Sequence, residues 1–140
     1  MSVEENRKVI RRYFEEVWNS GDLSVLDEIV DPAYINHSPS TPGTVQGPDD
    51  LKPVISVLRR AFPDLRFTIE DEVYEGDKVA IRCTMHGTHL GGSVFGMAPT
   101  GNVIKVNQIQ IDRIVNGKIV EHWKQTDDLG MMRQLGVMKE

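Results

Sequence analysis

The chain has 140 residues, of which 39% are hydrophobic and 26% are charged, and its formal net charge is −5. These values are typical of one soluble domain with its own core, so we expect residues 1–140 to form a single domain. The sequence has no block of lysines or arginines, which argues against a nucleic-acid partner. No stretch approaches the roughly 18 apolar residues of a transmembrane helix, which argues against a membrane partner.

The single cysteine and the first residues of the chain bear on its location. Cys83 cannot form an internal disulfide, and the N-terminal residues lack the charged start and apolar run of a signal peptide. Both features favour a reducing, cytoplasmic compartment. Cys83 lies in a strand-like run, where a small buried apolar residue is a better interpretation than a nucleophile.

Helical periodicity dominates the first part of the chain, and strand periodicity dominates the second. Ser2 and Glu5 have the spacing of a capping box, and apolar residues then recur at helical intervals up to Trp18. The expected elements are helices up to 18, at 22–30 and at 47–62, strands at 33–37, 65–74, 79–89, 103–115 and 119–126, and a helix at 128–135. Helices followed by hairpin-linked strands indicate an α+β fold, with an antiparallel sheet packed against helices on one face.

The last expected strand carries the most informative polar residues. Alternate side chains of a strand share one face, so Glu121, Trp123, Gln125 and Asp127 are expected on one side and His122 on the other. The first face has two acids, an indole and an amide, and it would line a polar pocket rather than a packed core. A carboxylate in a partly apolar pocket is suited to general acid–base catalysis.

Motifs along nearly the whole chain resemble one known family, the SnoaL-like polyketide cyclases. The motifs are Tyr34-Ile35-Asn36-His37, Phe62-Pro63-Asp64, Gly87-Thr88-His89, Pro99-Thr100-Gly101, the run from Gly117 to Trp123, Asp127, and Gln134-Leu135-Gly136. The family belongs to the nuclear transport factor 2-like superfamily, which also holds the ketosteroid isomerases. The resemblance implies a cone-shaped α+β fold, in which a curved sheet wraps around the helices and encloses a cavity.

The resemblance also implies a chemistry and an assembly. In the characterised cyclases, a cavity acid acts as general acid and base in an intramolecular aldol ring closure, with no metal, cofactor or Schiff base. Asp127 matches that acid by its position after Trp123, and His37 and His89 match positions of pocket-lining histidines. A small hydrophobic molecule is the expected partner, and the chain is expected to form a homodimer.

Each candidate for catalysis has a structural alternative. Asp127 precedes the last helix and could be its N-cap; we predict that Asp127 is catalytic and that Asp128 is the cap. His37 is as well explained by hydrogen bonds to its loop as by contact with a ligand. His89 ends a strand beside two glycines, and its alternative is a histidine on the sheet surface. His86 and His89 are three residues apart on a strand and therefore predict no metal site.

The expected ligand contacts come from the strands and from a glycine-rich loop at 91–101. They are Trp123, Tyr34, Asn107, Gln125, Glu121, Phe95 and Met97. Core packing explains the aromatic residues equally well, and Glu121 is expected to form a structural ion pair with Arg113 or Arg82. We read the loop as a cover over the cavity mouth, with Phe95 and Met97 either closing over a ligand or joining a subunit interface.

Three functions remain open from the sequence. The first is a cofactor-free acid–base enzyme acting on a hydrophobic carbonyl compound, with polyketide cyclase chemistry first and isomerase or hydrolase chemistry next. The second is a binding protein that uses the same cavity without turnover. The third is a structural dimerisation module, whose cavity would be filled by side chains.

Overall fold

The computed structural model describes residues 2–39 and 43–137. The first helix, α1, spans Val3–Arg12 and continues as a π-helical segment, Tyr13–Asn19. Ser2 is the N-cap, and its hydroxyl accepts a hydrogen bond from the backbone N–H of Glu5, as the capping motif predicts. Buried side chains follow this helix from Val9 to Trp18. The periodicity of the sequence therefore identified both the helix and its buried face.

The next elements are two short helical segments, two strands and the long helix α3. A short 3-10 turn at Leu23–Val25 leads into α2, Leu26–Ile29, where Asp22 caps the turn. Strand β1 then spans Val30–Asn36, β2 spans Val45–Gln46, and the long helix α3 spans Gly47–Ala61. Pro48 near the start of α3 and Pro63 just beyond it fit the usual positions of proline around a helix.

Four long strands complete the sheet. They are β3, Arg66–Glu75, β4, Lys78–Thr88, β5, Val103–Val115, and β6, Lys118–Thr126. The strand order is β2-β1-β6-β5-β4-β3. All neighbours pair antiparallel except β1, which runs parallel to β6. The expectation of a purely antiparallel sheet was therefore wrong at β1, because the chain returns to that strand from the helical layer and not through a hairpin.

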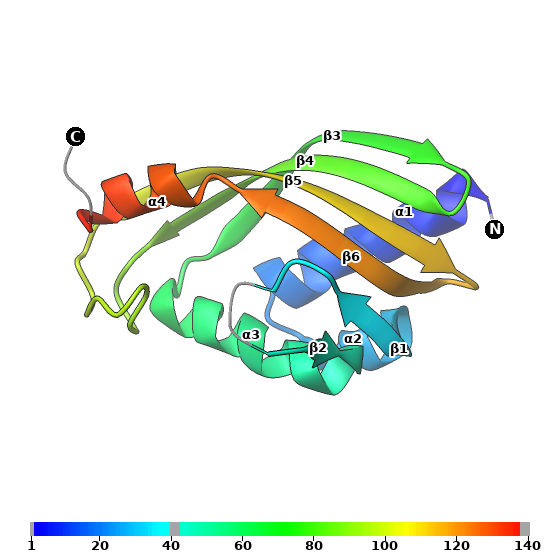
Figure 1. Cartoon of the computed structure of the whole chain (residues 1–140), viewed down its shortest axis with the longest axis horizontal. Helices are drawn as coiled ribbons and strands as arrows, with labels where there is room; N and C mark the ends of the chain where they lie inside the picture. The colour runs from blue at the N-terminus through cyan, green and yellow to red at the C-terminus, as the bar shows by residue number, and fades with distance from the viewer. Residues whose placement is uncertain (1, 40–42, 138–140) are drawn as a thin grey trace.

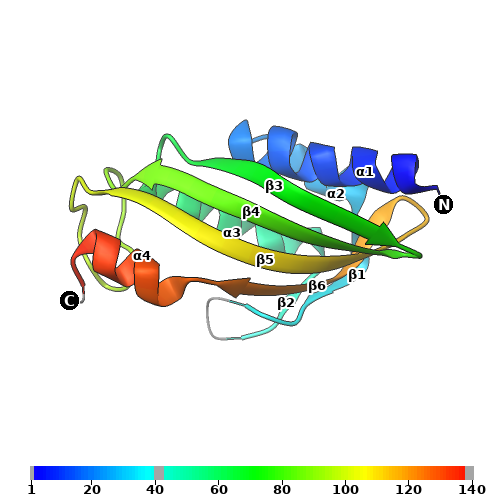
Figure 2. The same ribbon diagram turned by 90° about the horizontal axis from the view of Figure 1, so that it is seen from above.

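The sheet curves over the helices and leaves its other face uncovered. Helices α1, α2 and α3 lie against the concave face (Figure 1), and the view from above shows the outer face of β3, β4, β5 and β6 free of helices (Figure 2). The final helix, α4, spans Asp128–Leu135 and packs against β5 at one end of the sheet. The fold is α+β with an open six-stranded sheet, which is curved but not closed into a barrel.

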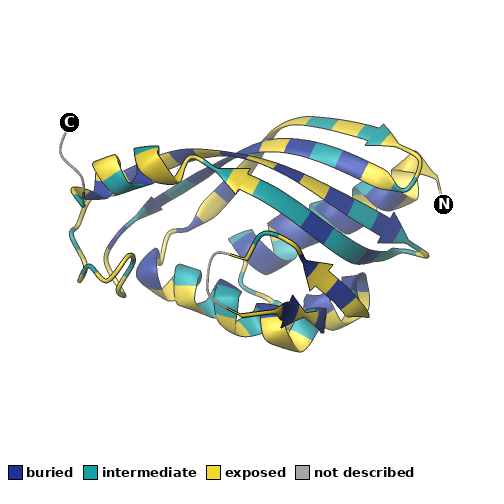
Figure 3. Ribbon diagram, in the orientation of Figure 1, coloured by how far each residue is buried: buried dark blue, intermediate teal, exposed yellow. Residues whose placement is uncertain are grey.

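Burial alternates along the central strand β5, as the striped ribbon in Figure 3 makes visible. Ile104 and Val106 are buried, whereas Ile109 and Ile111 are exposed. The apolar residues of β5 therefore fall on two faces of the sheet, one buried and one exposed. The inner face meets aromatic side chains of the first helix, Tyr13, Phe14 and Trp18, in one continuous core.

A β-bulge in the β5–β6 hairpin decides which residues of β6 face inward. Near the turn, Val115 pairs with Lys118 and Ile114 with Ile119, but beyond the irregularity Arg113 pairs with Glu121. The extra residue is Val120. A one-residue slip moves every later side chain of a strand to the opposite face. From Glu121 to Thr126, the faces of β6 are thus exchanged relative to a regular hairpin.

Candidate functional site

Polar side chains form a row across the inner face of β5 and β6, where an ordinary core would be apolar. The cross-strand pairs are Gln108 with Thr126, Gln110 with Lys124, and Asp112 with His122. Gln108, Gln110, Asp112 and His122 are all buried. Because neighbouring strands carry these residues in register, the row forms a polar floor beneath the helical layer.

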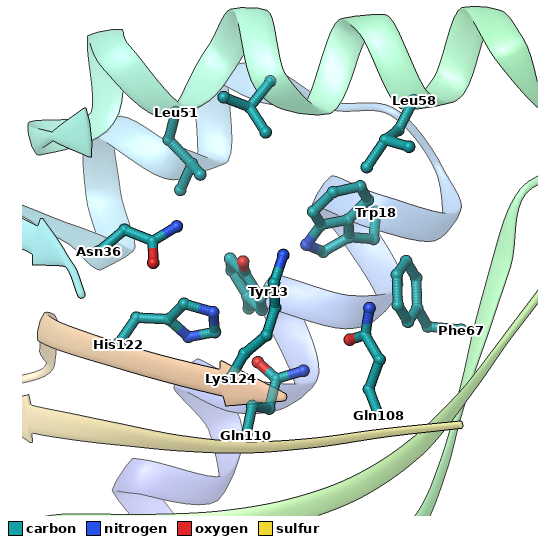
Figure 4. A pocket seen from close by; sticks show the side chains of 11 residues that line it. Tyr13, Trp18, Asn36, Leu51, Leu58, Phe67, Gln108, Gln110, His122 and Lys124 are labelled. Carbon is teal, nitrogen blue, oxygen red and sulfur yellow. The ribbon is translucent and has the colours of Figure 1, made fainter. Parts of the chain in front are cut away.

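The deepest pair of this row is an imidazole held by a carboxylate. Asp112 Oδ1 lies 2.6 Å from His122 Nδ1, and the two side chains are 1% and 6% exposed. A carboxylate at Nδ1 favours the tautomer with the proton on that nitrogen, which leaves Nε2 free to accept a proton. The His122 ring borders the pocket drawn in Figure 4. His122 is therefore oriented like a general base.

Two pockets with several lining residues in common lie over this floor. The inner pocket has a volume of about 40 Å³ and the outer one about 620 Å³. Gln108 and Lys124 from the sheet and Val54 and Leu58 from α3 line both of them. The inner pocket is closed by aromatic side chains, Tyr13, Trp18 and Phe67 (Figure 4). The cavity is thus apolar on its helical side and polar on its sheet side, and it is not filled by side chains as the alternative of a purely structural module would require.

Lys124 stands at the junction of the two pockets. Its side chain rises from β6 into the middle of the lining residues (Figure 4), and it lines the inner and the outer pocket. Burial lowers the pKa of its amine below the usual 10.5, and the negative charge of Asp128 acts in the opposite direction. A larger fraction of this amine is therefore neutral than in an exposed lysine.

Cys83 lies beside the polar floor, on the neighbouring strand β4, where it pairs with Gln108. Its Sγ lies 3.5 Å from Gln110 Nε2 and 3.8 Å from Gln108 Oε1. Burial raises the pKa of the thiol to about 11, so it remains protonated at neutral pH and is a poor nucleophile. This fits the prediction of a small buried side chain.

The structure places Asp127 at the helix cap and Asp128 at a pocket, which is the reverse of the prediction. Asp127 is the N-cap of α4, and its Oδ1 accepts a hydrogen bond of 2.9 Å from the backbone N–H of Gly130. Asp127 is exposed and lines neither pocket, whereas Asp128 lines the outer one. The prediction of Asp128 as the cap was wrong, as was the prediction that the face with Glu121, Trp123 and Asp127 lines the cavity. The bulge at Val120 is the physical reason, since it turns this face outward.

His37, Glu121 and Trp123 form a cluster on the outer side of the sheet. The His37 ring stacks on Trp123 with a centroid distance of 4.8 Å, and its Nε2 lies 3.0 Å from Glu121 Oε2. Arg113 Nη1 donates to Glu121 Oε1 at 3.1 Å, which confirms the expected ion pair. Arg113, and secondly His37, hold the pKa of Glu121 below its usual value. This cluster fixes β1 to β6 and does not meet the pocket.

His89 is buried but serves the glycine-rich loop and not the cavity. Its Nδ1 lies 3.2 Å from Thr100 Oγ1, its Nε2 contacts the carbonyl oxygen of Gly92, and its ring packs on Phe62. Backbone hydrogen bonds to Gly101 and Asn102 close the same loop at its base. His89 was predicted in the pocket or on the sheet surface, and it lies in neither place because it ties the two ends of the loop together.

The remaining predicted contacts are divided between core, surface and pocket mouth. Tyr34 is buried in the core, and Asn107 and Gln125 are exposed on the outer face of the sheet. Phe95 lines the outer pocket, as predicted for a loop that covers the mouth. Met97 lines neither pocket but pairs with Val94 within the loop. Phe95 is thus the one predicted contact found at the cavity.

The family model described as SnoaL-like polyketide cyclase matches residues 8–135. The chain belongs to this family. Among curated relatives, the SnoaL-like chain is 33% identical to the aklanonic acid methyl ester cyclase DauD of Streptomyces sp. (strain C5), covering 89% of this chain and 78% of that protein. It is 32% identical to the nogalonic acid methyl ester cyclase of Streptomyces nogalater, covering 85% and 89%.

Solved structures support the same assignment. TsrD from Streptomyces laurentii matches this SnoaL-like fold with a TM-score of 0.88 and 28% identity over 99% of both chains. IdmH from Streptomyces antibioticus matches with a TM-score of 0.80 and 33% identity, covering 93% of this chain and 97% of that one. The family resemblance and the cone-like α+β fold expected from the sequence are therefore confirmed.

Within residues 2–39 and 43–137, the SnoaL-like domain has no group of three histidine, cysteine or acidic residues placed to hold a metal ion. In the same described ranges, no helix is both long and apolar enough to cross a membrane. Among the described residues, the ionisable side chains that line the inner pocket are His122, Lys124 and Tyr13. Burial raises the pKa of the Tyr13 hydroxyl above its usual value, so this group stays protonated near neutral pH.

Proposed function

We propose that this SnoaL-like protein is a cofactor-free acid–base enzyme that acts on a hydrophobic ligand with carbonyl groups, in a ring closure of the intramolecular aldol type. The single observation that carries the proposal is the buried pair His122–Asp112, 2.6 Å apart, on the polar floor of a pocket whose helical wall is apolar. The names of the relatives add the substrate class, since two of them are cyclases of polyketide methyl esters.

The geometry suggests how the proton moves. His122 Nε2 takes a proton from the carbon next to a ligand carbonyl, and Asp112 stabilises the imidazolium that forms. The resulting enolate carbon attacks a second carbonyl of the same ligand, and His122 returns the proton to the new alkoxide. Polar side chains of Gln110 and Lys124 flank His122 and are placed to stabilise charge on oxygen. General base catalysis of this kind contributes roughly 10²–10⁴-fold to the rate.

The outer pocket supports a ligand of polyketide size. Its volume of about 620 Å³ lies in the usual range of roughly 300–1,000 Å³ for small-molecule sites. Pro53, Val57 and Leu58 of α3 form one wall, Val94 and Phe95 of the loop form another, and Met131 comes from α4. A flat aromatic body fits between such walls, while its carbonyl end reaches the polar floor.

The test is proton exchange at a carbon next to a carbonyl. The protein is incubated with 2-acetonaphthone in D₂O, and the loss of the methyl proton signal is followed by NMR. We expect catalysed exchange in the wild type and a loss of about 100-fold or more in His122→Asn. His86→Asn is the matched control, because His86 lies on the outer face of β4. Binding of the ketone without catalysed exchange would contradict the enzyme proposal and favour a binding protein.

We also propose that a second copy of the chain covers the outer face of the sheet. Ile109 and Ile111 lie side by side on β5 and are 57% and 40% exposed, and Trp123 lies opposite Ile111 on β6. Helices α1, α2 and α3 lie on the other side of the sheet, and α4 lies at one end of it (Figure 2). An apolar patch at the middle of a sheet, rather than at its edge, suits a symmetric contact between two identical faces.

A further inference from the structure

Gln110 carries a buried hydrogen-bond acceptor that is left without a partner. The residue is 4% exposed and lines the inner pocket. Within residues 2–39 and 43–137, nothing donates a hydrogen bond to its Oε1, and that atom is itself buried. A buried acceptor of this kind costs stability unless a donor reaches it. Because Oε1 belongs to a residue of the pocket lining, a ligand is the natural source of that donor.

The thiol of Cys83 fixes which end of the amide meets the pocket. Cys83 Sγ donates to Gln108 Oε1 at 3.8 Å, and Gln110 Nε2 donates to the same sulfur at 3.5 Å. Burial raises the pKa of the thiol to about 11, so its one hydrogen stays in place at neutral pH and is committed to Gln108. An inverted Gln110 amide would set Oε1 against a sulfur whose hydrogen is already used. Nε2 therefore stays on the sulfur, and Oε1 is left for the pocket.

The unpaired oxygen lies next to the proposed base. Figure 4 draws it on the side of His122. Gln110 pairs across the sheet with Lys124, and the next pair on the same face is Asp112 with His122. A group bound at Oε1 therefore lies beside the imidazole. Nε2 has a second hydrogen, so the acceptor role of Oε1 adds to the role of this amide beside His122 and does not replace it.

The size and polarity of the inner pocket restrict the donor that it accepts. Its volume of about 40 Å³ is larger than the roughly 10–15 Å³ that one water-sized group needs. It therefore takes a hydroxyl group, while the body of the ligand stays in the outer pocket. A cationic donor is unfavourable against the apolar wall of Leu51, Val54 and Leu58, and a carbonyl oxygen has no hydrogen to donate. The donor that fits is a neutral hydroxyl.

We propose that Gln110 selects ligands with a hydroxyl group, such as a phenol or an enol, and that its Oε1 accepts the hydrogen bond. The inference rests on the proposed function in taking this pocket as the ligand site, and it adds a hydroxyl to the carbonyl that the reaction requires. A ligand that fills the pocket without this donor displaces water and leaves Oε1 unpaired. Such a site rejects an analogue that lacks the hydroxyl more strongly than apolar contacts alone can.

Three naphthalenes of similar shape test this selection. 2-Naphthol has a hydroxyl that can donate, 2-methoxynaphthalene has an oxygen that can only accept, and 2-methylnaphthalene has neither. Their dissociation constants are measured by NMR titration of the ¹⁵N-labelled wild type and of Gln110→Met. We expect the preference for 2-naphthol over 2-methylnaphthalene to fall about tenfold in Gln110→Met, which is the loss of one hydrogen bond. The preference for 2-methoxynaphthalene over 2-methylnaphthalene should not change.

Further variants separate the hydroxyl contact from folding. Gln125→Met is the matched control, because it makes the same change on the outer face of the sheet, and it should keep the wild-type preference. Gln110→Leu should behave like Gln110→Met. In thermal melting without ligand, both should melt no lower than the wild type, because they remove a buried acceptor that has no partner. An unchanged preference in both, an equal loss for 2-methoxynaphthalene, or failure of 2-naphthol to bind would overturn the proposal.

Proton exchange of 2-acetonaphthone distinguishes this inference from the proposed function. Catalysed exchange without any preference for the hydroxyl would leave the acid–base function standing and make the inference wrong. A hydroxyl preference that depends on Gln110, in a protein that catalyses no exchange, would support the inference and contradict the acid–base function.

Discussion

Asp112 and His122 face each other across β5 and β6, with Oδ1 of the acid 2.6 Å from Nδ1 of the imidazole and both side chains buried. The other carboxylate oxygen of Asp112 has no hydrogen-bond partner among the described residues. A pair enclosed in this way depends on both members, since either one alone leaves a polar group in an apolar interior. The same enclosure holds His122 in one orientation beside the pocket.

The first prediction concerns the stability that this pair contributes. Replacing Asp112 by Ala leaves His122 without its partner, and we expect the free energy of unfolding to fall by about 3 kcal/mol. Urea denaturation followed by circular dichroism measures the change. The matched control is Asp71→Ala, which removes the exposed ion pair with Arg82 and should cost about 0.5 kcal/mol. Equal losses in the two variants would contradict this prediction, because they would show that the buried His122–Asp112 pair stabilises the fold no more than an exposed ion pair.

A second prediction separates the two neighbouring aspartates. Asp127→Ala removes the N-cap of α4 and should lower stability by about 1 kcal/mol, whereas Asp128→Ala should change stability little. Gly130→Ala should resemble Asp127→Ala, because a Cβ at Gly130 would overlap the Asp127 carboxylate. Urea denaturation of the three variants tests this. A larger loss from Asp128→Ala than from Asp127→Ala would reverse the assignment of the cap.

A third prediction follows from the lowered pKa of Lys124. In the unfolded chain the amine binds its proton up to a pKa near 10.5, whereas the folded chain releases the proton at a lower pH. Between these two values the unfolded state holds more protons, so stability rises with pH. Relative to Lys124→Met, the wild type should therefore gain stability from neutral pH towards 10.5.

Comparing the wild type with Lys124→Met cancels what the other ionisable groups that face Lys124 contribute to the pH dependence of stability. These groups are His122 on β6, Tyr13 on the first helix, Asp50 on α3, Cys83 on β4 and Asp128 at α4. Urea denaturation of both proteins over a pH series gives the difference in the free energy of unfolding. A difference that stays constant, or that falls as pH rises, would contradict the burial of this amine.

The fourth prediction addresses the outer face of the sheet. Ile109→Glu places a charge at the middle of the proposed subunit contact, and we expect the wild-type dimer to dissociate to monomers in sedimentation equilibrium. Val73→Glu is the control, because Val73 is also exposed but lies on the edge strand β3. A wild-type monomer, or a dimer that survives Ile109→Glu and not Val73→Glu, would place the contact elsewhere or remove it.

Local patterns were sufficient to predict the elements. Helix α3 was recognised from its apolar stripe between Gly47 and Phe62, and the turn at Asn116-Gly117 located the last hairpin. These signals act over a few residues and need no knowledge of distant contacts. The parallel pairing of β1 with β6 joins residues that are 86 positions apart in the chain, such as Asn36 and His122, and no local pattern encodes that pairing.

The face of β6 could not be predicted from its own residues. One face carries Glu121 and Trp123 and the other His122 and Lys124, so polarity does not distinguish them. A regular hairpin through Asn116-Gly117 would pair Asp112 with Glu121, whereas the bulge at Val120 pairs it with His122. The inward position of Gln108, Gln110 and Asp112 could have been predicted, because they alternate in step with the apolar residues Ile104 and Val106 along β5. That observation would have identified the polar floor without identifying its partners on β6.

The two tryptophans of the chain provide the most direct test of where the ligand binds. Trp18 lines the inner pocket, whereas Trp123 stacks on His37 on the outer side of the sheet. Titrating ¹⁵N-labelled protein with 2-acetonaphthone and following the two indole N–H signals by NMR reports on both places at once. We predict that the Trp18 signal shifts and the Trp123 signal does not. A shift of Trp123 alone would contradict the account, because it would place the ligand on the face that carries Asp127 and not over His122 and Lys124.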